Sequence, residues 1–142
     1  MRALQAACYS RNRGAPHERA AVGVRVTAAL APGVLEALLG PGGPRDRFPV
    51  ADRAEEYHAL VALLLANASD PADPTTPQVA AAIAAGCLGQ EHLWRDLGLP
   101  ERPVLRALIA AYFAPLVAEN DRDIRWKLFF YRKLCGWGGF ST

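Results

Sequence analysis

Apolar residues recur at three- and four-residue steps in several parts of the chain, as expected for helices that bury one face. The clearest case is Pro103–Val117, where apolar pairs repeat every four positions and Pro115 is expected to bend the last turn. A second helix is predicted over Asp52–Asn67, where Asp52 and Glu55 have the spacing of a capping box. Its predicted buried stripe consists of Tyr57, Leu60, Val61, Leu64 and Leu65.

Further helices are indicated by apolar spacing and by the Gly and Pro residues that bound them. They are expected at residues 32–39, 79–87 and 90–100, and from near Asp121 or Asp123 to about Cys135. Gly40–Pro49 and Asn67–Pro77 are interpreted as loops because turn-forming residues fill them, and Thr76 before Pro77 suits a helix start. Residues 17–31 allow a helix or, because their valines alternate, a short extended piece.

These elements predict an all-α, single-domain bundle of about five to seven helices. A chain of 142 residues fits one domain, which can bury enough surface to fold without disulfides. We expect a loosely ordered N-terminal arm over residues 1–16, a helical domain over 17–135 and a flexible end over 136–142.

Charge and cysteine content exclude several classes of protein. A net charge of +2 is too small for a typical nucleic-acid-binding domain. No apolar run approaches the roughly 20 residues that span a bilayer, and polar residues interrupt the N-terminus where a secretory signal would need an apolar core. Three widely spaced cysteines do not suit a secreted disulfide framework, so we expect reduced thiols and a cytoplasmic location.

Residues that could carry chemistry are few. No pair of Cys or His residues has the short spacing of a metal motif, and no nucleophile, base and orienting group stand at a recognisable spacing. A single cysteine is more often a small buried hydrophobe than a ligand, and this interpretation is favoured for Cys8 and Cys87. For Cys135, which precedes a Gly-rich end, the two interpretations are equally open.

The last predicted helix carries a strip of basic residues, namely Arg125, Lys127, Arg132 and Lys133. Such a strip could contact an acidic partner or RNA. Solvated cations outside a core of aromatic residues are the favoured alternative.

Two sequence blocks are distinctive in combination. The first contains Cys87-Leu88-Gly89, His92-Leu93-Trp94 and Asp96-Leu97-Gly98-Leu99, and the second contains Asn120, Ile124, Trp126-Lys127, Phe129, Tyr131 and Cys135. In order and spacing they resemble the NifQ family, whose pattern joins a CLG-x-x-HLW-x-DLGL block to an N-x-x-x-M/I-x-W-K-x-F-x-Y-x-x-x-C block. The resemblance extends over residues 50 to 140 and is weaker before them.

The resemblance implies a function in assembly of the iron–molybdenum cofactor of nitrogenase. NifQ-like proteins are thought to carry molybdenum within an iron–sulfur cluster and to donate it to the cofactor-assembly proteins. The chain would then be a carrier whose partners are these proteins, and not an enzyme. A docking module that binds no metal, and recognises such a partner through the basic helix or the His92-Leu93-Trp94 segment, is the alternative.

The family's expected cluster ligands are a cysteine run, C-x4-C-x2-C-x5-C, that begins a few residues after the position of Cys135. The sequence ends at Thr142 and holds none of these cysteines. Because thiolates hold iron–sulfur clusters, we expect that the 142-residue chain does not retain the cluster. A truncated family member and a degenerate paralogue are both open, and truncation is favoured because the helices look intact. If this form binds a metal, the expected ligands are Cys135 first, then Cys87 and His92.

Overall fold

The computed structural model describes residue 30 and residues 32–136. The predictions for the arm over residues 1–16, for residues 17–29 and for residues 137–142 therefore lie outside the described residues, as does Cys8.

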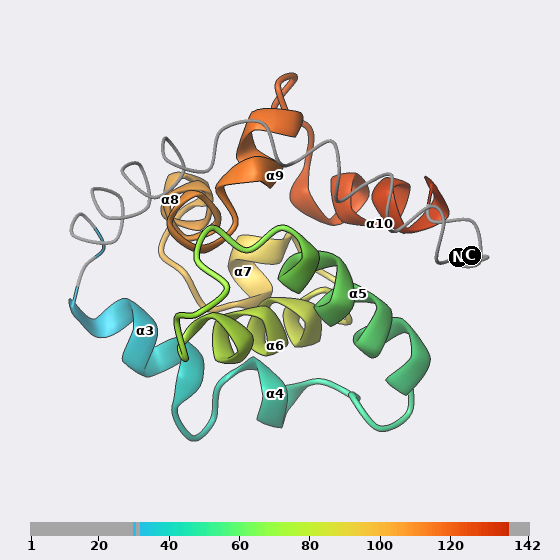
Figure 1. Cartoon of the computed structure of the whole chain (residues 1–142). Coiled ribbons are helices and arrows are strands. Elements are labelled where there is room, and N and C mark those ends of the chain that lie inside the picture. Colours follow the sequence, from blue (N-terminus) through green and yellow to red (C-terminus); the bar gives the residue numbers. More distant parts are fainter. Residues whose placement is uncertain (1–29, 31, 137–142) are drawn as a thin grey trace.

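All regular elements in the described part are helices (Figure 1), so the prediction of an all-α domain is confirmed. In chain order they are α3 (Pro32–Leu39), α4 (Pro44–Arg47), α5 (Ala54–Ala66), α6 (Thr76–Gly86), α7 (Leu93–Asp96), α8 (Arg102–Tyr112), α9 (Ala114–Glu119) and α10 (Trp126–Gly136). Within this part, none is long and apolar enough to cross a membrane.

The Ala-rich helix α6 lies at the centre of the fold (Figure 1), where α3, α4, α5 and α7 all contact it. Its alanines at positions 80, 82, 84 and 85 are completely buried. Small side chains allow neighbouring helices to approach closely, which explains how one short helix can hold four others. The helix begins at Thr76, as the Thr-Pro pair predicted. Its neighbour α4 lies in a segment predicted to be a loop, because Pro44 is placed in a first helical turn.

Two details of the α5 prediction are wrong. Arg53 occupies the N-cap position and no side chain caps the helix, so Asp52 and Glu55 form no capping box. Leu63 is completely buried, whereas Leu65, which was assigned to the buried stripe, is 39% exposed. Because both α6 and α10 contact α5, its buried face is wider than one stripe and is displaced toward Leu63.

The segment predicted as one helix over residues 103–117 forms two helices. The break is at Phe113 (φ −140°, ψ 52°), two residues before Pro115, which then occupies the first turn of α9. Proline cannot donate the hydrogen bond to the carbonyl four residues earlier, and its ring would clash with that carbonyl, so α8 cannot continue through Pro115. Ser69 compensates for the break: its N–H donates to the carbonyl of Tyr112 and its Oγ accepts from the N–H of Ala114.

The last helix begins at Trp126, later than the predicted start at Asp121 or Asp123. Asn120, which is 3% exposed, shapes the loop before it. The Asn120 Oδ1 accepts from the N–H of Ile124 at 2.9 Å, and its Nδ2 donates to the Ile124 carbonyl at 3.0 Å. Asp123 has a positive φ of 53°, a conformation in which helix cannot continue.

Candidate functional site

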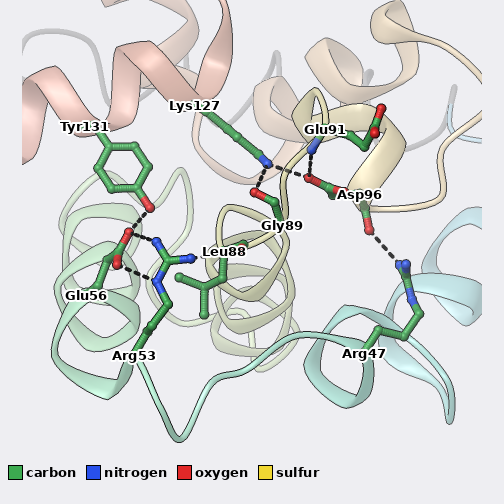
Figure 2. A network of polar contacts seen from close by, with 9 residues as sticks. All are labelled: Arg47, Arg53, Glu56, Leu88, Gly89, Glu91, Asp96, Lys127 and Tyr131. Carbon is green, nitrogen blue, oxygen red and sulfur yellow. Dashed lines mark hydrogen bonds and ion pairs between the residues drawn. The ribbon is translucent and has the colours of Figure 1, made fainter.

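An ion pair joins the two sequence blocks inside the fold (Figure 2). The Lys127 ammonium, from the first turn of α10, donates to the Asp96 carboxylate at the end of α7 and to the carbonyl of Gly89. The Asp96 carboxylate also accepts from the N–H of Glu91 at 3.1 Å. The side chains of Asp96 and Lys127 are only 7% and 19% exposed, so this is a largely desolvated pair.

The backbone turn between α6 and α7 is shaped to admit this pair. A Cβ on Gly89 would lie 2.5 Å from the Asp96 carboxylate, so only glycine leaves room for the charge. From the other side, Arg47 of α4 donates to the carbonyl of Asp96 at 2.6 Å. Asp96 is therefore held by side chains from both α4 and α10, which are far apart in the sequence.

A second polar network lies beside the first and links α5 to α10 (Figure 2). Arg53 forms two hydrogen bonds with Glu56, at 2.8 and 2.5 Å, and donates to the carbonyl of Leu88 at 2.9 Å. The hydroxyl of Tyr131 donates to the same Glu56 carboxylate. Burial and this hydrogen bond raise the pKa of Tyr131, so its hydroxyl keeps the proton that it donates.

Cys87 lies at the end of α6, in the turn that both networks hold, and its side chain is buried. Burial is the largest cause that raises the pKa of the Cys87 thiol, which is about 12; the Lys127 ammonium lowers this pKa, and the Glu56 and Asp96 carboxylates raise it. A metal ligand must be the thiolate. In this conformation Cys87 is a neutral thiol at neutral pH, which does not suit a ligand.

The other two predicted ligands are at the surface. His92 is exposed at the N-cap position of α7, and Cys135 is exposed in the last turn of α10. Throughout the described residues, no group of three His, Cys, Asp or Glu side chains is placed to hold a metal ion. The described part of the chain thus offers no complete cluster site, and the ligand roles of Cys135, Cys87 and His92 remain predictions.

The basic strip predicted on the last helix is not continuous. Arg125 and Arg132 are exposed, as expected for an outer face. Lys127 points inward to Asp96, and Lys133, whose side chain is 10% exposed, pairs with Glu119 at 2.5 Å. Two of the four cations therefore neutralise buried or half-buried carboxylates and are not available to a partner.

The sequence patterns did not indicate the structural roles of Asp96, Arg53 and Glu56, or the hydrogen bond of Tyr131. An exposed charged residue lies next to each of these charges in the sequence, so a local pattern does not show which of them is buried. The one available signal was that Asp96 and Lys127 belong to the two blocks of the family pattern.

An open cleft of about 570 Å³ lies between α7, the start of α8 and the first turn of α10. Both sequence blocks contribute to its wall: His92, Leu93 and Trp94 from the first, and Trp126 and Lys127 from the second. A volume of this size is in the range of ligand-binding clefts. It is the surface feature at which the two blocks meet.

Comparison with known proteins places these features in a family. The NifQ family model matches residues 17–142 of the chain. Protein NifQ of Rhodobacter capsulatus is 38% identical over 125 residues, which are 77% of this chain and 69% of that protein. Protein NifQ of Azotobacter vinelandii is 45% identical over 83 residues, which are 58% of this chain and 42% of that protein.

Protein NifQ of Klebsiella pneumoniae is 42% identical over 85 residues, which cover 60% of this chain and 48% of that protein. The alignments thus span less than half the length of the Azotobacter and Klebsiella relatives. No solved structure matches the chain significantly. The family model covers most of the sequence, and the chain therefore belongs to the NifQ family.

Proposed function

We propose that the chain acts in assembly of the iron–molybdenum cofactor of nitrogenase, as a carrier that donates molybdenum from an iron–sulfur cluster and not as an enzyme. Membership of the NifQ family supports the coarser part of this proposal, a function in nitrogen fixation. In this proposal the molybdenum and iron are cargo, the receiving partners are cofactor-assembly proteins, and the chain works in the cytoplasm.

The observation that carries the proposal is the position of Cys135. Its thiol is exposed in the last turn of α10, a helix that is anchored to the body by Lys127, Tyr131 and Lys133. A ligand that must receive and release a metal has to be accessible, and a fixed helix limits the entropy lost when the metal binds. Cys135 therefore suits an exchangeable ligand position better than the buried Cys87.

One thiolate does not hold an iron–sulfur cluster, which needs several. The proposal gives Cys135 one ligand position and places the remaining ligands outside the described residues. Cys87 is assigned a packing role, because its raised pKa and burial both favour the neutral thiol.

Because we expect that the 142 residues alone do not retain the cluster, the test uses the chain extended at its C-terminus by the family's cysteine run, C-x4-C-x2-C-x5-C. Its metal content is measured after purification and anaerobic incubation with molybdate, iron and sulfide. We expect bound molybdenum and iron in a fixed ratio to protein, and loss of most of both in Cys135→Ser. Cys87→Ala is the matched control, because it removes a thiol that the proposal does not use; it should keep its metal. A folded chain that binds no metal, or an effect of Cys87→Ala equal to that of Cys135→Ser, would contradict the carrier proposal.

A second function, that of a docking module without a metal of its own, is favoured by the cleft at which both sequence blocks meet. Here the chain would bind a cofactor-assembly protein, and the cleft would be the recognition surface. Co-purification of the chain with each nitrogenase-assembly protein tests this function. Binding that survives Cys135→Ser would support docking separately from metal carriage, and failure to bind any of them would exclude it.

A further inference from the structure

The wall of the cleft between α7 and α10 carries three cations, Arg102, Arg125 and Lys127, and one carboxylate, that of Glu91. Of the cations in its wall, Lys127 pairs with Asp96 and Arg102 pairs with Asp123 at 2.9 Å. Arg125 also lines the cleft and is exposed, and in the described part of the chain no carboxylate pairs with it. Arg125 is thus a cation available to a ligand.

A second available cation lies beside the cleft. The guanidinium of Arg95 is 5.0 Å from the ring centre of Trp94, a cleft residue, and is exposed. This stacking holds the charge near the cleft without neutralising it. Arg125 in the wall and Arg95 beside it are two cations without a carboxylate partner in the described part of the chain, and the wall has one exposed carboxylate, that of Glu91. The local charge is therefore about +1, which favours an acidic ligand.

The same cleft is apolar at its other side. Leu128 is 47% exposed, more than Leu65, the other exposed large hydrophobic residue in the described part of the chain. Trp94 is half-buried in the wall, and Trp126 lies behind it with an indole N–H that has no acceptor. Exposed leucine, tryptophan and arginine together are typical of the centre of a protein–protein interface.

From these observations we infer that the cleft binds a segment of a partner protein that carries both large apolar side chains and carboxylates. The apolar side chains would pack on Leu128 and Trp94, and the carboxylates would pair with Arg125 and Arg95. This inference deepens the docking function by naming the chemistry of the partner segment, and it does not require that the chain bind a metal.

The test is a titration of the isotope-labelled chain with three nine-residue peptides, followed by NMR shifts of the backbone amides. One peptide alternates Glu with Leu, one alternates Lys with Leu, and one alternates Glu with Gly. The Glu–Leu peptide should bind saturably and shift residues of the cleft, and raised salt should weaken it. The other two should bind at least about tenfold more weakly, because each lacks one half of the recognition.

Matched variants distinguish binding at the cleft from nonspecific electrostatic or hydrophobic binding elsewhere on the surface. Arg125→Glu should weaken the Glu–Leu peptide by about tenfold or more. Arg132→Glu makes the same charge change at an exposed arginine of α10 that does not line the cleft, and it should have little effect. Leu128→Ser should weaken binding, whereas Leu65→Ser, at the other exposed leucine, should not.

Four outcomes would overturn the inference. They are the absence of saturable Glu–Leu binding, shifts that lie outside the cleft, full competition by inorganic phosphate alone, and tighter binding of a short single-stranded RNA than of the peptide. Metal content measured on Arg125→Glu keeps the two proposals apart: we expect it to equal that of the unchanged chain, so a failure of peptide binding leaves the carrier proposal standing.

Discussion

We expect the ion pair between Lys127 and Asp96 to contribute strongly to holding α10 in its position on the rest of the protein. Replacing Lys127 with Met keeps the length of the side chain and removes its charge. The Asp96 carboxylate would then be left 93% buried, with the N–H of Glu91 as a remaining donor, and the Gly89 carbonyl would lose the ammonium. The main free-energy cost of this change is that the Asp96 carboxylate stays buried without its partner; this cost is larger than the loss of the attraction itself.

The expected size of the effect follows from the burial of the two groups. Breaking a buried pair from one side costs about 3–5 kcal/mol. Lys127 is 19% exposed, so water can partly replace its ammonium, and we expect the lower end, about 3 kcal/mol. Because a domain of this size is stable by about 5–15 kcal/mol, the variant should fold but unfold at clearly lower urea concentration.

Urea unfolding followed by circular dichroism at 222 nm measures this loss. A second variant, Asp96→Asn in the Lys127→Met background, removes the unpaired charge while keeping an oxygen that can accept from the N–H of Glu91. It should recover about 2 kcal/mol relative to Lys127→Met alone. If Lys127→Met costs less than about 1 kcal/mol, in the range of a surface pair, or if the two changes are simply additive, the pair does not fix α10 as argued.

Four further predictions concern the same turn and the last helix. Gly89→Ala should lower the free energy of unfolding by about 1–3 kcal/mol because its Cβ meets the Asp96 carboxylate, and a neutral result in urea unfolding would show that the turn can shift. Asn120→Ala removes both hydrogen bonds that close the loop before α10 and should cost about 1–3 kcal/mol in the same assay, whereas an unchanged midpoint would assign that loop to other contacts. Iodoacetamide at pH 7.5, read by site-resolved mass spectrometry, should alkylate Cys135 in the folded chain well before Cys87, and equal rates would contradict the buried, neutral thiol. Burial raises the pKa of Cys87 to about 12, so the stability that its neutral thiol contributes is fully present below the unfolded pKa of about 8.5 and is lost as the pH rises toward 12. From pH 7 to pH 10 the unchanged chain should therefore lose about 2 kcal/mol of unfolding free energy relative to Cys87→Ala. A difference that stays constant over this range would refute the raised pKa.

The sequence alone determined the class of the fold and most helix positions. Apolar spacing and the Gly and Pro residues between segments fix where helices can form, and these signals are local. The helix start at Thr76 and the end of the first described helix at Leu39 were found in this way. The spacing of the two blocks also determined the family, which the matches with NifQ proteins confirm.

Predicted boundaries failed where hydrogen bonds outside the helices decided them. The helix over residues 103–117 is broken at Phe113, before Pro115, and Ser69, from another segment, takes up the hydrogen bonds that the break leaves open. The last helix starts at Trp126 because Asn120 closes a loop before it. A helical pattern shows which residues could face the core, but it does not show which backbone groups find partners elsewhere.

The candidate site depended most on the tertiary structure. The sequence showed Cys87, His92 and Cys135 as possible ligands and a strip of four basic residues, but it could not show that Cys87 is buried or that Lys127 and Lys133 point inward. Whether a charged side chain meets water or a buried carboxylate depends on which helix packs against it, and the attraction acts between residues 31 positions apart for Lys127 and Asp96. For this reason the sequence determined which charged and thiol groups the protein has, while only the packing of α10 on the body decided which of them remain available to a ligand.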